Sequence, residues 1–296
     1  MNARLNEDVL KAVSRSFYLS LRVLPREMRN AACVGYLCAR TSDTVADHDG
    51  PAGEKHKALD SFAGAVNGGS FAGWSDSLLR CVNEPGERVL LEHAGGVLRL
   101  LETLPERERI LVRDVMATII SGQRLDLDRF GDAGGVMPDR EALEDYIWRV
   151  AGCVGAFWTK LGFAMLGPRF SSADESDLLA TGIRFGTALQ LVNVLRDVGE
   201  DLRAGRCYLP VAEPENRKAF LMEYAHWLDV AEVRAGDGLR YAAAMNGARL
   251  RLAAALPARL ALQTVALLRA EGDRVPGKRV KVPRSSVYLA MLKSFF

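Results

Sequence analysis

The sequence predicts an all-α protein that folds as a single domain over residues 1–296. Apolar residues recur at spacings of three and four along most of the chain, as they do on the buried face of an amphipathic helix. The alternation of apolar and polar residues that marks a half-buried strand never persists. No internal repeat or low-complexity linker divides the chain. Hydrophobic residues make up 49% of it, which is enough for a sizeable core.

Helices are expected throughout, and proline and glycine mark where most of them begin or end. Pro25 ends the first helix, Pro105 stands at the first turn of another, and Gly205 with Pro210 ends the helix that carries the second acidic motif. Pro257 is expected to kink or separate the last two helices. Residues 131–138 are the clearest loop. The expected ranges are 6–24, 26–47, 54–66, 87–103, 105–124, 140–166, a helix through 182–200, and then 214–235, 237–256 and 258–271.

Composition excludes several classes of function. The net charge is only +2, so no nucleic-acid footprint is present, and the four histidines have no metal-ligand spacing, which argues against zinc. Five cysteines without a C-x-x-C pair predict reduced, buried thiols in a cytoplasmic protein. The polar N-terminus lacks the apolar core of a signal peptide. The sequence contains no run of 18 apolar residues, so we expect no membrane-spanning helix.

An acidic motif lies in the second half of the chain, on a segment that is otherwise apolar. Spacings of three, four and four place an amide pair and an acidic pair on one face of a helix. Carboxylates buried this close together are costly unless cations neutralise them, and oxygen ligands of this kind suit Mg²⁺, which also accepts substrate phosphates. The four residues are Gln190, Asn193, Asp197 and Asp201.

A second motif of the same design lies about 150 residues upstream. Tyr36, Arg40, Asp43 and Asp47 follow one another at spacings of four, three and four, so they too share one helical face. A single D-x-x-x-D occurs by chance on many solvated helices. Two such motifs, each on an apolar helix with an arginine beside it, Arg40 in one and Arg196 in the other, predict a metal site that ionises a diphosphate.

Two further features leave alternatives open. Asp126 and Asp128 precede the loop at 131–138, where they are either extra metal ligands or, by preference, a solvated helix end. Glycines interrupt the helix at 150–156, and Gly182 and Gly186 do the same on the next helix. These small residues allow close helix packing, or they leave room for a long apolar tail, and the two interpretations are compatible.

Four segments together resemble the signatures of the squalene/phytoene synthase family, the head-to-head prenyl synthases. They are residues 14–18, the Asp43–Asp47 motif, residues 150–155 and residues 190–210, and they occur in the family's order. The resemblance covers roughly residues 10 to 290. It implies an isoprenoid synthase helical bundle with a central apolar cavity, and Mg²⁺-dependent condensation of two prenyl diphosphates.

The resemblance also implies roles for individual residues. Many relatives carry a tyrosine directly before Val-Ala-Gly, where this chain has Arg149, so Tyr146, one turn earlier, becomes the candidate catalytic phenol. The implied metal ligands are Asp43, Asp47, Asn193, Asp197 and Asp201. The implied diphosphate-binding residues are Ser14, Ser16, Arg40, Asn193, Arg196, Arg206 and Tyr208. The implied catalytic set is Asp43, Asp47, Asp197, Asp201, Arg40 and Tyr146.

A basic segment near the C-terminus bears on the product. Residues 280–284 partly resemble a segment that helps to hold NADPH in the squalene-forming branch, which implies that Lys281 and Arg284 bind this cofactor. We therefore expect a squalene synthase that joins two farnesyl diphosphates through presqualene diphosphate and reduces the product with NADPH. The alternatives are a phytoene or dehydrosqualene synthase, which needs no reductant, and a presqualene diphosphate synthase.

Other classes fit less well. A terpene cyclase or a head-to-tail prenyl synthase also uses two acidic helices, but its second motif differs from the one at 190–210. A non-catalytic assembly factor with this fold would be expected to lose the aspartates, and all four are present. Apolar products leave room for a peripheral contact with the inner face of the membrane, and the oligomeric state stays open.

Overall fold

The structure is a computed structural model that describes residues 21–277, and it is almost entirely helical, as predicted. The chain divides into two compact units, Met1–Asp132 and Ala133–Phe296. We call them the N-terminal and the C-terminal unit. The expectation of a single domain is not tested by this division and stays a prediction.

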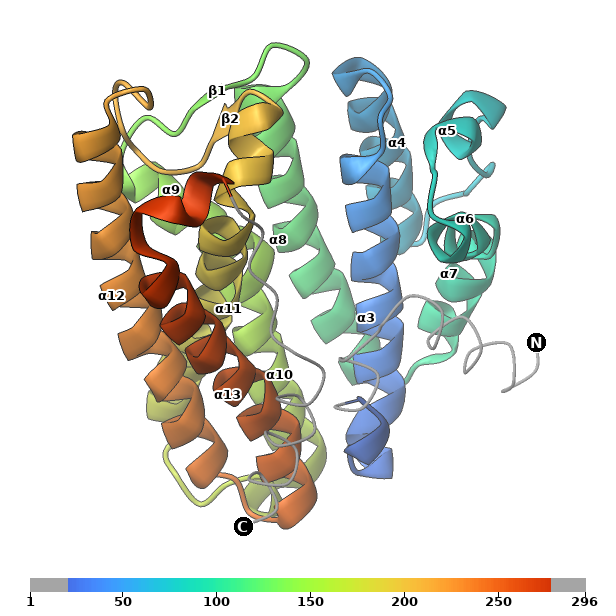
Figure 1. The fold of residues 1–296 in the computed structure, drawn as a ribbon. Helices are drawn as coiled ribbons and strands as arrows, with labels where there is room; N and C mark the ends of the chain where they lie inside the picture. Colours follow the sequence, from blue (N-terminus) through green and yellow to red (C-terminus); the bar gives the residue numbers. More distant parts are fainter. Residues whose placement is uncertain (1–20, 278–296) are drawn as a thin grey trace. The chain divides into compact units, whose positions relative to one another are not determined.

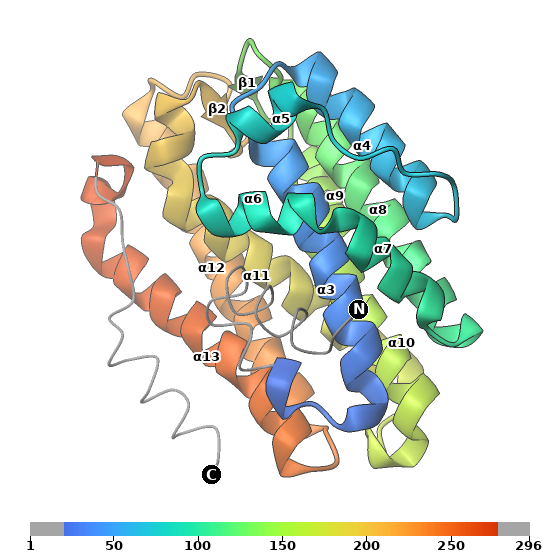
Figure 2. The ribbon, with the colours of Figure 1, turned by 90° about the vertical axis from the view of Figure 1, so that its right-hand side faces the viewer.

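The N-terminal unit is built around α3, which packs against α4, α6, α7 and α8. Figure 2 shows α6 crossing α3. The helix expected at 87–103 is two helices, since it breaks at His93, and the one expected at 105–124 runs on to Phe130. The helices are α3 (Arg26–Asp47), α4 (Ala52–Val66), α5 (Asp76–Cys81), α6 (Pro85–Glu92), α7 (Ala94–Thr103) and α8 (Glu106–Phe130).

A buried histidine turns the chain directly after α3. The Nδ1 atom of His48 accepts a hydrogen bond of 2.8 Å from the backbone N–H of Gly50. Burial lowers the pKa of His48, which keeps the ring neutral and able to accept. A Cβ on Gly50 would lie 2.3 Å from the ring, so only glycine fits here. This turn ends α3 immediately after Asp47, the last residue of the first acidic motif.

The C-terminal unit is built around α11, which packs against α10, α12 and α13 (Figure 1). A π-helical segment, η1, continues α9 into α10, and π-helical turns are rare in proteins. The elements are β1 (Gly135–Val136), α9 (Arg140–Ile147), η1 (Trp148–Gly152), α10 (Cys153–Leu166), η2 (Gly167–Arg169), α11 (Glu175–Arg203), β2 (Arg206–Cys207), α12 (Arg217–Ala243), α13 (Ala248–Glu271) and η3 (Gly272–Gly277).

The three helices expected after Pro210 are two, so this part of the prediction is wrong. The helix α12 continues through Gly236 and Gly238. Gly238 lies where helices pack closely, since a Cβ there would lie 2.4 Å from the ring of Phe185 and 2.8 Å from Ala258. The missing side chain lets α11 and α13 approach α12 closely. Pro257 lies inside α13 rather than between two helices, where the packing of its buried alanine neighbours keeps the helix intact.

Small residues bring α10 and the preceding η1 into backbone contact with α11. A Cβ on Gly155 would lie 2.0 Å from the carbonyl oxygen of Gly182, and a Cβ on Gly186 would lie 2.4 Å from that of Ala151. Both distances are far below any real Cβ contact. The close-packing interpretation of these glycines is therefore confirmed, and no space for a tail exists at these two points.

Within residues 21–277, three stretches are long and apolar enough to cross a membrane, by length and composition alone: Arg140–Arg169, Glu175–Arg203 and Ala248–Val275. The sequence has no unbroken run of 18 apolar residues, and on that basis no such helix is expected; these stretches qualify by their average composition. One of them is α11, which carries the second acidic motif. Cytoplasmic location and peripheral membrane contact stay predictions.

Candidate active site

The first acidic motif lies on the open face of α3. Tyr36, Arg40 and Asp43 are partly buried, Asp47 is exposed, and the side chains between them are mostly buried. Buried neighbours include Leu37, Cys38, Thr41, Ser42, Thr44 and Val45. The helical face predicted from the spacing is thus present, and we call it the first half-site.

Asp43 is the most perturbed carboxyl of the first half-site. Its Oδ1 atom accepts a hydrogen bond of 2.7 Å from Nε2 of Gln123 on α8, and the same Nε2 donates to Oγ of Ser42 at 3.1 Å. Burial, and then the charge of Asp47, raises the pKa of Asp43 to about 7, although Arg40 and Gln123 oppose the shift. A cation beside this carboxyl would relieve the cost of ionising it.

Arg40, predicted to bind diphosphate, is paired with an acid outside the motif. Its Nη2 atom donates to Oε1 of Glu87 on α6 in a short, half-buried ion pair, while its Nε atom is buried without a partner. The charge of Glu87 also repels that of Asp43 and is the smallest of the causes that raise the pKa of Asp43. The first half-site therefore pairs its arginine with a second acid, although the charge of Arg40 still lowers the pKa of Asp43.

The second acidic motif lies on α11, and we call it the second half-site. Asn193, Asp197 and Asp201 are partly buried, whereas Leu191, Val194 and Leu195 between them are buried. The Nδ2 atom of Asn193 donates a hydrogen bond of 3.4 Å to Oε1 of Gln190. This orientation leaves the carbonyl oxygen of Asn193 available to a cation. The predicted face is present here too.

Arginines neutralise both aspartates of the second half-site. Arg196 binds Asp197 through two hydrogen bonds, from Nε to Oδ1 at 2.9 Å and from Nη2 to Oδ2 at 2.5 Å. Arg206 donates from Nη2 to Oδ1 of Asp201 at 3.2 Å. Burial nevertheless raises the pKa of Asp201 to about 6, because the attraction of Arg206 is countered by the charges of Asp197 and Glu200.

A short backbone pairing fixes the segment that follows α11. The strands β1 and β2 pair in parallel, with N–H to O=C hydrogen bonds of 2.8 Å from Gly135 to Gly205 and from Met137 to Cys207. Gly134 has φ +70°, and a Cβ there would lie 2.3 Å from the carbonyl oxygen of Gly205. The loop predicted at 131–138 thus holds the backbone of Arg206, whose side chain binds Asp201.

Two predicted tyrosines meet beside this pairing. Tyr146 on α9 and Tyr208 after β2 stack with ring centroids 5.3 Å apart, and each is 8% exposed. The Nε atom of Arg149 donates to both carboxylate oxygens of Asp145, four residues earlier, at 3.0 Å and 2.9 Å. Arg149 therefore takes a structural partner, and Tyr146 stays the candidate phenol.

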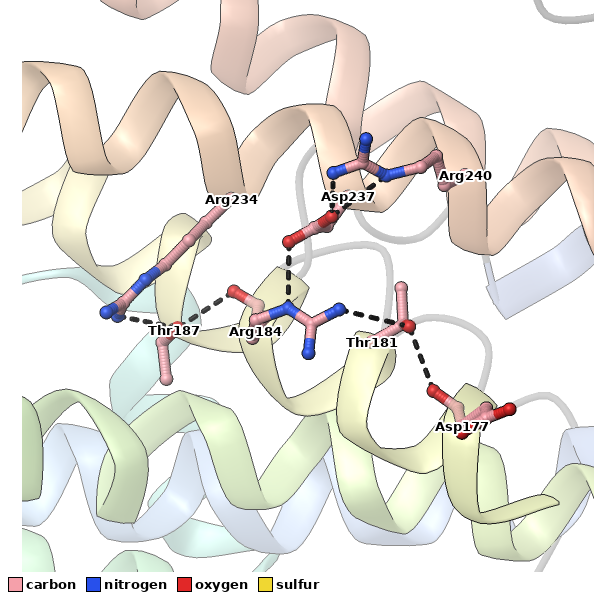
Figure 3. A network of polar contacts seen from close by, with 7 residues as sticks. All are labelled: Asp177, Thr181, Arg184, Thr187, Arg234, Asp237 and Arg240. Carbon is pink, nitrogen blue, oxygen red and sulfur yellow. Dashed lines mark hydrogen bonds and ion pairs between the residues drawn. The ribbon is translucent and has the colours of Figure 1, made fainter. Parts of the chain in front are cut away.

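A polar network fastens α11 to α12 one turn before the second half-site (Figure 3). Nε of Arg184 donates to Oδ2 of Asp237 at 2.9 Å, and Nη1 of Arg234 donates to Oγ1 of Thr187 at 3.2 Å. Arg234 also binds Glu144 on α9 through two hydrogen bonds. Burial alone would raise the pKa of Asp237, but the arginine partners lower it below its usual range. The network sets the position of α11 along its neighbours.

Four predicted residues lie outside the described part of the chain: Ser14, Ser16, Lys281 and Arg284. Asp128 is exposed and pairs with His56 at 3.1 Å, which matches a solvated helix end better than a metal ligand. All five cysteines are free, and burial raises the pKa of Cys33, Cys38, Cys153 and Cys207.

The donor atoms of both half-sites fit Mg²⁺. Each half-site offers two aspartates, the second adds an amide oxygen, and hard oxygen donors of this kind are the usual ligands of Mg²⁺. Oε1 of Gln123, which is buried without a partner beside Asp43, is a further acceptor. Within residues 21–277, no three His, Cys, Asp or Glu side chains gather into a complete metal site, so Mg²⁺ would keep waters or take substrate oxygens.

Sequence reasoning missed Gln123 and Glu87. Gln123 interrupts an apolar stripe of α8, between Ile119, Ile120 and Leu127, and a polar residue in such a stripe is a signal that could have been used. Glu87 gave no such signal, because it lies in the first turn of a short helix, where acidic residues are common.

Two curated proteins are similar to much of this chain. The chain is 31% identical to the presqualene diphosphate synthase of Zymomonas mobilis over 204 residues, which cover 69% of this chain and 58% of the other. It is 30% identical to the phytoene synthase of Thermus thermophilus over 231 residues, which cover 77% and 63%. The chain thus spans less than two thirds of the length of these curated relatives.

Solved structures share the fold. The complex of TcSQS with the ligand E5700 matches with a TM-score of 0.81 at 23% identity, covering 99% of this chain and 85% of that one. The squalene synthase HpnC from Alicyclobacillus acidocaldarius matches with a TM-score of 0.61 at 21% identity, covering 92% and 97%. The family model described as squalene/phytoene synthase matches residues 10–286. With nearly the whole chain matched and both acidic motifs present, the protein belongs to the squalene/phytoene synthase family.

Proposed function

We propose that the protein is a prenyltransferase that condenses two farnesyl diphosphates head to head, through presqualene diphosphate, and reduces the product to squalene with NADPH. The observation that carries the proposal is the pair of half-sites: two aspartates on the open face of a buried helix, with arginines beside them, occurring twice in one chain. Membership of the family supports the head-to-head condensation.

Mg²⁺, when bound, would neutralise the aspartates and stabilise the charge that develops on the departing diphosphate. Asp43 and Asp47 in the first half-site, and Asn193, Asp197 and Asp201 in the second, are the residues that would hold it. In the structure, Arg196 pairs with Asp197 and Arg206 with Asp201. With the carboxylates of Asp197 and Asp201 on the cation, the guanidinium groups of Arg196 and Arg206 would be available to phosphate oxygens.

Arg40 is placed for the same role in the first half-site. Its partner Glu87 stands outside the motif, so an incoming diphosphate competes with one half-buried carboxylate for the guanidinium. Tyr146 and Tyr208 form a buried aromatic pair next to the second half-site, where ring faces favour carbocations and exclude water. We propose that Tyr146 is the phenol that steers the proton.

The choice of product depends on residues outside the described part of the chain. Lys281 and Arg284 support an NADPH site, whereas the matched relatives include presqualene diphosphate synthases and phytoene synthases. Those names favour two alternatives that need no reductant: release of the cyclopropyl diphosphate, or loss of a proton to give dehydrosqualene or phytoene.

The test is to incubate the purified protein with Mg²⁺ and either farnesyl or geranylgeranyl diphosphate, with and without NADPH, and to identify each product by mass spectrometry. Squalene formed only with NADPH is the expected result. A hydrocarbon with a central double bond whose rate ignores NADPH would replace the squalene assignment with a phytoene-type one. Absence of any head-to-head product from both substrates would end the proposal.

A matched pair of variants tests the cofactor residues. Replacing Lys281 and Arg284 together with Ala should spare the formation of presqualene diphosphate, which needs no reductant, and should raise the NADPH concentration that squalene formation requires. Replacing Arg274 and Arg269 with Ala is the control, because their side chains are fixed by acids on α12 and α13.

A further inference from the structure

We propose that Gln123 is a positioning residue of the first half-site, which holds the carboxylate of Asp43 with its amide nitrogen and offers its carbonyl oxygen to a water of the bound cation. The inference rests on the proposed function in one respect, namely that the first half-site binds Mg²⁺. It extends that function to a residue on α8, outside both acidic motifs.

The contacts of the Gln123 side chain join two helices at the motif. Nε2 lies 2.7 Å from Oδ1 of Asp43 and 3.1 Å from Oγ of Ser42, so both hydrogens of the amide group are directed at α3. The Ser42 hydroxyl donates in turn to the carbonyl oxygen of Ala39 at 2.9 Å. Each acceptor is thus fixed within α3, and the amide fixes the rotamer of Asp43 against it.

The orientation of this amide follows from its neighbours. With Asp43 ionised, a flipped amide would place its carbonyl oxygen 2.7 Å from the carboxylate, and two acceptors would meet without a hydrogen. With the nitrogen toward Asp43, Oε1 points the other way. That oxygen is buried and has no hydrogen-bond partner among residues 21–277, and the residue is 6% exposed.

A buried carbonyl oxygen without a partner calls for an explanation, since nearly all such groups are satisfied in folded proteins. Mg²⁺ keeps several of its waters when it binds to protein carboxylates, and those waters are strong donors. Side chains that hydrogen-bond a metal-binding carboxylate orient it toward the ion. Gln123 has one polar atom for each role. Its Nε2 atom donates to Asp43, and its Oε1 atom is left to accept from a water of the ion.

The surroundings argue against a simple packing role. Met116, Ile119 and Ile120 are at most 3% exposed on the same stripe of α8, and Leu127, one turn on, is 8% exposed. Methionine has nearly the same length and shape as glutamine and would fill this stripe without an unsatisfied atom. A glutamine here is explained by what its two polar atoms bind.

The experiment uses the full-length protein and MgCl₂ alone as the probe. The melting temperature of wild type and Gln123→Met is measured over a range of MgCl₂ at fixed pH and ionic strength, which gives the concentration for half of the Mg²⁺-dependent stabilisation. Loss of a group that supports a metal ligand costs roughly 10–100-fold in affinity. We expect the midpoint of Gln123→Met to rise by about that factor.

Gln263→Met is the matched control. Gln263 lies on α13, a helix that carries neither motif, and its Oε1 atom is also buried without a partner among residues 21–277, so the change removes the same chemical group from outside the first half-site. Its Mg²⁺ midpoint should equal that of wild type. An unchanged midpoint in Gln123→Met, with only the metal-free melting temperature altered, would overturn the proposal, as would a wild type that Mg²⁺ does not stabilise.

Gln123→Asn keeps the test decisive if the methionine variant does not fold. It retains the amide but withdraws it by one methylene group, so the hydrogen bond to Asp43 is lost while a polar group stays. The same rise in midpoint supports the proposal, and a wild-type midpoint refutes it. Because this readout needs no substrate, it is independent of the product assay: a protein that makes no head-to-head product can still show the shift, and an active one can fail to show it.

Discussion

The two half-sites carry the same motif but balance its charge in different ways. On α11, Arg196 and Arg206 bind Asp197 and Asp201 directly. On α3, the arginine of the motif turns to Glu87, and Asp43 has a neutral amide as its partner. Burial raises the pKa of Asp43 to about 7 and that of Asp201 to about 6; the charge of Asp47 adds to the first shift, and Arg206 opposes the second.

This contrast implies that the two half-sites respond differently to a cation. In the first half-site, burial and the charge of Asp47 oppose the ionisation of Asp43, so a cation there would relieve this cost. The second half-site is already neutralised, and a cation must displace arginines to bind. The first should therefore contribute more to Mg²⁺-dependent stability, and the second should deliver the arginines that meet the diphosphate.

Removing one aspartate from each half-site should have the strongest effect. Asp43→Asn and Asp197→Asn should each reduce turnover by more than about 100-fold, since a direct ligand matters more than a group that merely supports one. Their effects on metal-free stability should differ in sign at pH 8. Asp43→Asn removes a strained charge and stabilises, whereas Asp197→Asn leaves Arg196 with one hydrogen bond and destabilises by up to about 1 kcal/mol.

Product formation at saturating Mg²⁺ and urea unfolding without Mg²⁺ measure the two effects. Asp114→Asn is a suitable control for turnover, because this residue is exposed on α8 and lies outside both motifs. If either motif variant kept near-normal turnover, the use of two half-sites would be wrong. If both lost stability equally at pH 8, the contrast in charge balance would be wrong.

The second prediction concerns how the motif helices are packed. Side chains such as Leu37 and Val45 pack α3, whereas α11 meets α10 through backbone at Gly155 and Gly182. Gly155→Ala places a Cβ 2.0 Å from a carbonyl oxygen and should lower the free energy of unfolding by about 3 kcal/mol. Urea unfolding measures the change.

Gly236→Ala on α12 is the matched control. A Cβ there would meet no heavy atom within 4 Å, so alanine should stabilise this helix by about 0.5–1 kcal/mol. A Gly155→Ala protein as stable as wild type, with an altered preference between C15 and C20 substrates, would favour the tail-space interpretation of this glycine after all.

The third prediction is a pH dependence. Asp43 has an ordinary pKa near 3.8 and a folded one of about 7, so the folded protein binds the extra proton between these values. The stability that this carboxyl contributes is present below about pH 4 and is lost as the pH rises through 7. Because water screens a half-buried group, we expect about 1–2 kcal/mol.

Asp43→Asn isolates this contribution. The difference in unfolding free energy between wild type and variant should grow from pH 5 to pH 8 without metal, and MgCl₂ should abolish it at pH 8 by stabilising the wild type alone. Urea titrations at four pH values give the curve. A difference that does not vary with pH would mean that Asp43 ionises normally in the folded protein.

The sequence was a good guide to the motif helices because their boundaries have local causes. The range 26–47 matches α3, which starts after a proline and ends at His48, and residues 190–200 lie inside α11 as expected. Spacing alone placed Asp43 with Asp47, and Asp197 with Asp201, on open faces. Local periodicity sets these features, so one sequence is enough to find them.

Long-range contacts set the features that the sequence did not reveal. A helix break is expected near Gly236 and Gly238, yet α12 continues, because Gly238 makes room for a ring on α11. The partners of these polar side chains follow no spacing rule. Arg40 binds Glu87, 47 residues away, and Gln123 binds Asp43, 80 residues away. Such pairs depend on how helices cross, which periodicity does not encode.

The weakest effect that we expect is also the most direct test of the contrast between the half-sites. Glu87→Gln keeps the shape of the side chain but removes the charge that holds Arg40. An ion pair this accessible contributes about 0.2–1 kcal/mol, so metal-free stability should fall by no more than that. Because the variant frees Arg40 and removes a negative charge near Asp43, the pKa of Asp43 should fall slightly below its wild-type value. Carbon-13 NMR of the aspartate carboxyl groups, with Asp43→Asn for assignment, measures that pKa. A pKa that rises in Glu87→Gln would show that Glu87 positions Arg40 to the benefit of Asp43, and the first half-site would then be arginine-compensated like the second.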